Sequence, residues 1–140
     1  MLVDANILLY AVDTSTPFHE RAREWMESAL NGPRRVAIPW ASLLAFARIS
    51  THARALRNPL SPAEAWEFIE DWRAAPATWI PTPGRGYSEI LGRLIRELDL
   101  RGALIADAAV AALCIEHGLA VVSADSDFAR FSDVEWINPL

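Results

Sequence analysis

Lysine is absent from this chain of 140 residues, because all 13 of its Lys and Arg positions are arginine. That absence excludes chemistries that need a lysine amine, including the phosphate-binding P-loop and Schiff-base catalysis. It also excludes receiver domains, which place a lysine beside their phosphorylated aspartate. Cysteine occurs once, at Cys114, which excludes an internal disulfide and a cysteine-rich zinc site.

Long apolar runs are also missing, since none approaches the roughly 20 residues that span a bilayer. The first residues enter an apolar segment without a basic leader or cleavage site, so we expect a cytoplasmic protein with no membrane contact. Hydrophobic residues make up 52% of the chain and charged residues 22%, which is typical of globular proteins. The length fits a single domain over residues 1–140.

Acidic residues are absent from one stretch, residues 34–63, which carries five arginines and is therefore +5. The net charge of the chain is −5, so the remainder is −10. A basic segment beside an acidic remainder would suit an enzyme that works on a polyanion, although chance clustering on a solvated surface is an equal alternative.

Short apolar segments alternate with amphipathic ones along the chain, which predicts a mainly parallel sheet with helices on both faces, a three-layer α/β/α sandwich. The predicted strands are 2–3, 36–38, 78–80, 120–122 and 135–137. The predicted helices are 17–30, 40–50, 62–74, 90–98 and 104–117, with a short helical turn at 127–131. Binding sites in such folds lie beyond the carboxyl ends of the strands.

Three of the apolar segments carry aspartates: Asp4, Asp107 and Asp125. Burying an unpaired carboxylate costs several kcal/mol or more, so converging carboxylates need a compensating cation. A hard divalent ion such as Mg²⁺ is the simplest one. The pattern therefore favours a metal-dependent phosphoester enzyme.

Each aspartate also has a structural alternative. Asp4 could serve only as the N-cap of a helix that starts near residue 5. Asp107 is the only charged side chain between Gly102 and Ile115, and a structural role would need a distant partner such as Arg48. Asp125 lies in a turn, where aspartate is common for local reasons.

Neighbouring polar residues support these three. Asn6 could orient the carboxylate of Asp4, and Ser123 could support Asp125 through its hydroxyl. Asp127 is better placed than Asp125 to cap the short helical turn, which leaves Asp125 as the better ligand.

Taken together, these residues resemble the PIN-domain ribonucleases, in particular the VapC toxins of toxin–antitoxin pairs. The resemblance covers the whole chain and is carried by the opening 3–6 (VDAN), by 107–119 and by 121–128 (VVSADSDF). The closing residues 131–139 are similar to a mycobacterial branch of that family. The resemblance to this family implies a PIN-like α/β/α sandwich, dependence on Mg²⁺ or Mn²⁺, RNA cleavage and a homodimer. It also implies inhibition by a small antitoxin whose C-terminal tail occupies the active-site groove.

Carried over by position, Asp4, Asp107 and Asp125 match the family's acids and Ser123 its usual Ser or Thr. One departure stands out, because the family commonly has a glutamate in the helix after the second strand. Here Ala45 or Phe46 occupies that place, which puts a second metal position in doubt unless Asp127 compensates.

We therefore expect Asp4, Asp107 and Asp125 to be the catalytic metal ligands, supported by Asn6, Ser123 and Asp127. The ion would activate water for attack on a phosphodiester, leaving a 5′-phosphate and a 3′-hydroxyl. The expected substrate contacts come from the basic stretch: Arg48, His52 and Arg54.

Two other functions remain compatible with the sequence. An Mg²⁺-dependent phosphatase or phosphotransferase would need an Asp-x-Asp pair after the first strand, and Asn6 occupies its second position. A catalytically inactive PIN-like protein-interaction module is favoured slightly by the missing glutamate and by Trp66, which falls outside the apolar face of its helix.

Overall fold

Five short strands form one sheet in the computed structural model, which describes residues 1–140. All neighbouring strands pair in parallel, in the order β3-β2-β1-β4-β5. The strands are β1 (Leu2–Val3), β2 (Val36–Ala37), β3 (Thr78–Trp79), β4 (Val121–Val122) and β5 (Trp136–Ile137). Each has two residues, fewer than the three predicted for the last four.

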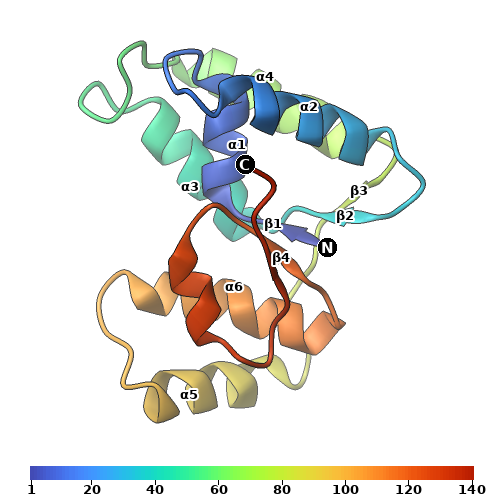
Figure 1. Cartoon of the computed structure of the whole chain (residues 1–140), viewed down its shortest axis with the longest axis vertical. Helices are drawn as coiled ribbons and strands as arrows, with labels where there is room; N and C mark the ends of the chain where they lie inside the picture. Colours follow the sequence, from blue (N-terminus) through green and yellow to red (C-terminus); the bar gives the residue numbers. More distant parts are fainter.

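Helices cover both faces of this sheet (Figure 1). One layer holds α1 (Ala5–Val12), α2 (His19–Leu30), α3 (Trp40–Ser50) and α4 (Pro62–Ala74). The other holds α5 (Tyr87–Glu97) and α6 (Leu104–His117), followed by the 3₁₀ helix η1 (Ser126–Arg130). The predicted three-layer α/β/α sandwich is confirmed. None of the helices combines the length and the hydrophobicity that spanning a bilayer requires.

The core divides into two clusters, one on each side of the sheet, because successive strand residues point to opposite faces. Leu2 and Val121 belong to the cluster beneath α5 and α6, whereas Val3 and Val122 belong to the cluster beneath α1 to α4. All four side chains are fully buried. Strands buried on both faces explain why these segments are continuously apolar in the sequence.

Local sequence signals set the ends of some helices. Ser61 and Glu64 form a reciprocal capping box at the start of α4, and Gly118 ends α6 in the left-handed conformation with φ of 64°. The predicted start of α2 at Pro17 is wrong, because α2 begins at His19. The backbone of Thr16 instead accepts a hydrogen bond from His19 N at 3.2 Å, so residues 16–19 form a turn that precedes the helix.

The chain changes direction across the sheet between β1 and β4. From β1 it runs outward through β2 to β3, and then β4 and β5 are added on the other side of β1. In parallel sheets the crevice at this switch point, beyond the carboxyl ends of the strands, is where ligands bind. Asp4 and Ser123 directly follow the two strands that meet there.

Candidate active site

Strand register brings Asp4 and Ser123 together although 119 positions separate them. Val3 lies opposite Val122, and Asp4 N donates to Val122 O at 3.0 Å, so the next residue of each strand is also a neighbour. The Ser123 hydroxyl, which is fully buried, donates to Asp4 Oδ2 at 2.8 Å.

Asn6 completes this network from the first turn of α1. Its Nδ2 donates to Asp4 Oδ2 and to Ser123 Oγ, both at 2.8 Å, and its Oδ1 accepts from Ala124 N at 3.2 Å. The other oxygen of Asp4, Oδ1, accepts from Ala5 N at 2.7 Å. Asp4 is therefore the N-cap of α1 and also a carboxylate fixed in direction by two polar side chains.

Asp107 reaches the same place from the first turn of α6. It and Asp4 line one pocket of about 230 Å³ between α1, α3 and α6, whose other lining residues are mostly apolar. The Asp107 carboxylate has neither a hydrogen-bond partner nor an ion pair within the chain, in contrast to Asp4. Its carboxylate oxygens are therefore free to bind a ligand in the pocket.

Burial raises the pKa of Asp107 to about 6, and the negative charges of Asp4, Asp125 and Asp127 add to the effect, against a smaller opposing effect of Arg130. Burial also raises the pKa of Asp4 above its ordinary value, although the hydrogen bonds from Ser123 and Ala5 work in the other direction. The charge of Asp125 raises it further. The carboxylates thus repel one another, and no cationic side chain lines the pocket with them.

Asp125 lies at the edge of this arrangement and does not line the pocket. It is the N-cap of η1, because its Oδ1 accepts from Asp127 N at 2.8 Å. The prediction that Asp127 would provide this cap is wrong, since Asp127 forms an ion pair with Arg130 one turn later. No three acidic, histidine or cysteine side chains are close enough together to enclose an ion by themselves.

Helix α3 contributes no acid to the pocket. Ala45 lines it, whereas Phe46 is fully buried on another face and packs edge-on against Trp72 at 4.7 Å between ring centroids. The position that could carry the family's glutamate into this pocket is therefore Ala45. Ser42, one turn earlier, also lines the pocket, a feature that we did not predict. The only sequence signal for it is a hydroxyl within an otherwise apolar segment.

The expected substrate contacts lie together beside the acidic pocket. Arg48, His52 and Arg54 line a hollow of about 260 Å³ at the end of α3. Ile49 borders both this hollow and the acidic pocket, so the two are adjacent. None of these three side chains forms an ion pair within the chain, so the proposed structural partner of Asp107, Arg48, does not fill that role.

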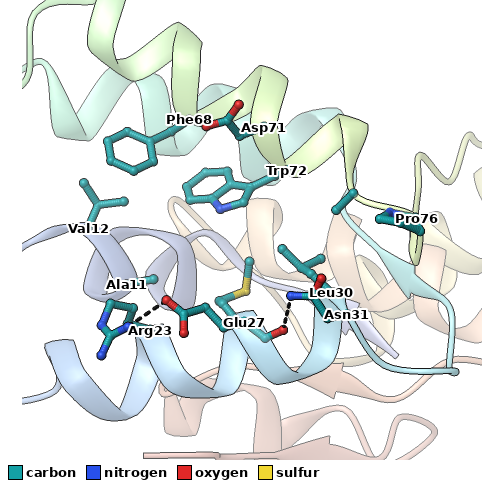
Figure 2. Close-up of a pocket in the computed structure, with 12 residues that line it drawn as sticks. Ala11, Val12, Arg23, Glu27, Leu30, Asn31, Phe68, Asp71, Trp72 and Pro76 are labelled. Atoms are coloured by element: carbon teal, nitrogen blue, oxygen red, sulfur yellow. Dashed lines mark hydrogen bonds and ion pairs between the residues drawn. The ribbon is translucent and has the colours of Figure 1, made fainter.

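The largest cavity is a separate groove of about 380 Å³ between α1, α2 and α4. Figure 2 shows Phe68 and Trp72 of α4 facing Val12 and Leu30 across it, with the Arg23–Glu27 ion pair at its border. None of the site residues predicted from the sequence lines this groove. We could not predict it, because it depends on how three helices pack.

Comparison with known proteins places these features in a family. The model of the PIN domain matches residues 1–134. Ribonuclease VapC37 of Mycobacterium tuberculosis is 40% identical over 138 residues, which cover 99% of this chain and 96% of the relative. Ribonuclease VapC33 of the same species is 37% identical over 140 residues, covering 100% of this chain and 98% of the relative.

Solved structures show the same fold at lower sequence identity. VapBC2 from Rickettsia felis, bound to a DNA fragment of its promoter, superimposes with a TM-score of 0.72 at 15% identity, over 98% of this chain and 96% of the other. VapBC-1 from nontypeable Haemophilus influenzae gives 0.70 at 15% identity, over 99% and 96%. The family model and the full-length VapC relatives show that this chain belongs to the PIN-domain family, in its VapC branch.

Proposed function

We propose that this VapC-type ribonuclease cleaves RNA phosphodiester bonds with a divalent cation, Mg²⁺ or Mn²⁺, held by Asp4 and Asp107. Asp125 would act as a further ligand, directly or through water. The observation that carries the proposal is the pair of carboxylates that line one pocket with no cation of the chain between them.

The residues present fit such an ion. Hard divalent cations prefer carboxylate and hydroxyl oxygens, which the pocket offers, and Mg²⁺ usually keeps several waters, so two or three protein ligands suffice. When bound, the ion would supply Lewis-acid activation of water and stabilisation of the leaving oxygen. Burial and the neighbouring carboxylates raise the pKa values of Asp4 and Asp107 because they disfavour negative charge. The same conditions would favour the binding of a cation, which compensates that charge.

The chain's own residues would divide the remaining work. Asn6 and Ser123 hold Asp4 Oδ2 and so fix the direction of its carboxylate, as supporting residues commonly do around metal ligands. Arg48, His52 and Arg54 would contact RNA phosphates in the adjoining hollow. Asp127 would hold Arg130 at the border of the site.

The test is RNA cleavage by Asp107→Asn in the presence of Mn²⁺. We expect loss of cleavage by at least a hundredfold with the fold intact, because the amide keeps the shape of the side chain and removes its charge. The matched control is Asp99→Asn, an exposed aspartate that pairs only with Arg101 and should leave cleavage unchanged. Full activity of Asp107→Asn would reject the assignment.

We also propose that a small antitoxin neutralises the enzyme, its C-terminal tail entering the active-site groove. Support comes from the solved structures of similar fold, which include VapBC2, VapBC-1 and a toxin–antitoxin complex from Klebsiella pneumoniae. A short reading frame directly upstream, encoding a protein that inhibits RNA cleavage at equimolar amounts, is the expected finding. An upstream product without any effect on cleavage would contradict the proposal.

A homodimer is the remaining proposal on partners. Trp66 is 48% exposed and stacks on Trp40, with Leu44 also exposed on α3, so these side chains leave an apolar surface uncovered. We expect sedimentation velocity to show a dimer that Trp66→Ser weakens. A monomer at all concentrations would contradict this.

A further inference from the structure

Ser42 carries a buried hydroxyl without a partner. The residue is 2% exposed, and Ser42 Oγ makes no hydrogen bond. Leaving a buried hydroxyl unsatisfied costs about 1–3 kcal/mol, and such groups are rare enough in native proteins to need an explanation.

Its position on the helix accounts for the missing bond. Inside a helix, the hydroxyl of a serine or threonine can donate a hydrogen bond to the backbone carbonyl three or four residues earlier. Thr51 does so with Ala47 O at 2.7 Å, and Ser50 approaches the same carbonyl at 3.5 Å. Ser42 stands in the first turn of α3, where the carbonyl of Pro39 already accepts from the backbone N–H groups of Ser42 and Leu43. The Ser42 hydroxyl is bonded neither to that carbonyl nor to any other group.

Ser42 is one of the residues that line the pocket of the two aspartates. Ser42 is the only polar side chain that α3 contributes there, beside Ala41, Ala45 and Ile49. The small side chain at Ala45 leaves room on this wall, at the place where a longer acidic side chain would otherwise reach in. The pocket therefore has carboxylates on two walls and a single hydroxyl on the third.

We propose that Ser42 is a further cation-positioning residue of this site, whose hydroxyl oxygen binds the divalent ion or one of its waters from the α3 side. The inference rests on the proposed metal dependence and adds a residue to it. Asp4, Asp107 and Ser42 then surround the ion from α1, α6 and α3. Serine supplies no charge, so the site holds the ion with fewer negative ligands than one with an acid on α3.

Mn²⁺ binding, measured by electron paramagnetic resonance without RNA, tests this directly. Ser42→Ala should weaken Mn²⁺ binding about tenfold, the usual cost of losing a group that orients a metal or its ligands. Ser42→Thr, which keeps the hydroxyl, should bind within about twofold of the wild type. Ser50→Ala is the matched control, because Ser50 is buried on the same helix but does not line the pocket.

Thermal unfolding of the metal-free variants separates this role from a structural one. Ser42→Ala should unfold at or above the wild-type temperature, since it removes an unsatisfied group. A lower unfolding temperature together with unchanged Mn²⁺ binding would overturn the proposal in favour of a packing role.

Asp107→Asn distinguishes failure of this inference from failure of the proposed function. If Asp107→Asn loses Mn²⁺ and Ser42→Ala retains it, the metal site stands and the role of Ser42 is refuted. If the wild type itself binds no Mn²⁺, both the metal dependence and the role of Ser42 are refuted.

Discussion

Asp107 shows how one side chain can be unfavourable for the metal-free fold and still be the residue on which the proposed metal site depends. It stands in the first turn of an otherwise apolar helix, with no partner of its own and with Asp4, Asp125 and Asp127 close enough to repel it. Its position in the sequence, as the single charge of that segment, was sufficient to single it out. Its neighbours could not be identified without knowing the strand register.

Replacing this charge should stabilise the metal-free protein. Because folding raises the pKa of Asp107 to about 6, keeping this carboxylate ionised at neutral pH costs more free energy in the folded state than in the unfolded chain. Asp107→Asn should therefore raise the free energy of unfolding at pH 7.5 by about 1 kcal/mol, less than the full shift implies because solvent screens a half-buried group. Urea denaturation in EDTA measures this, and a destabilised variant would contradict the repulsion described here.

Proton competition should make metal binding depend on pH. A raised pKa means that Asp107 takes up a proton as the pH falls through about 6, and a protonated carboxyl binds a cation poorly. We expect the affinity for Mn²⁺ to be constant above pH 7 and to fall by about tenfold per pH unit below 6. The charged groups that act on the pKa of Asp107 are Asp4, Asp125, Asp127 and Arg130. An affinity that stays constant down to pH 4.5 would show that Asp107 is not a ligand.

At the scale of single elements, sequence signals worked where they are local. The capping box of Ser61 and Glu64, and Gly118 at the end of α6, set helix ends as predicted. Two local predictions failed because the same residues took part in other short-range interactions. The turn at Thr16 delays α2 to His19, and Asp125 rather than Asp127 caps η1 because Asp127 pairs with Arg130.

Helix α3 shows which part of an element can be changed to alter the site. Ala45 faces the acidic pocket, whereas Leu44 points outward and is 58% exposed. Ala45→Glu should add a third carboxylate and strengthen Mn²⁺ binding about tenfold, since the charge of the ligand set tunes cation affinity. Leu44→Glu, the control, should leave Mn²⁺ binding unchanged; equal effects of both variants, measured by Mn²⁺ titration, would contradict this orientation of α3.

At the scale of the whole molecule, the topology of the sheet determines which distant segments meet, and no local sequence pattern shows this. The alternation of strands and helices predicted the α/β/α sandwich, which is confirmed, and the rule for switch points predicted where acids from distant segments would meet. The same reasoning did not reveal that Asp125 stays outside the pocket wall, that Ser42 enters it, or that a separate groove opens between α1, α2 and α4. Those features depend on side-chain packing between elements.

The structure gives an argument against each of the two other functions considered from the sequence, the phosphatase and the inactive interaction module. Asn6 lies where a phosphatase of this type would carry its second aspartate, and it is engaged with Asp4, Ser123 and Ala124 N as a fixed hydrogen-bonding group. An inactive interaction module would not explain why the carboxylates of Asp4 and Asp107 share a pocket without a counter-charge.

The basic stretch beside the site should make RNA binding depend on salt. Each arginine that contacts a phosphate releases counterions from the RNA. Removing one such arginine should therefore make the slope of the logarithm of the binding constant against the logarithm of the salt concentration less negative by about 1. In an Asp107→Asn background, which prevents cleavage, we expect this change for Arg54→Ala. Arg101→Ala, which removes an exposed arginine paired with Asp99, should leave the slope unchanged. Equal slopes for all three proteins in fluorescence anisotropy would place the RNA elsewhere.

The central claim is that Asp4 and Asp107 share one divalent cation, and a crystal grown with Mn²⁺ tests it most directly. Anomalous diffraction from manganese should give a peak in the pocket within coordination distance, about 2.2 Å, of a carboxylate oxygen of each residue. A pocket without such a peak at saturating Mn²⁺, or a peak bound to other residues, would contradict the account.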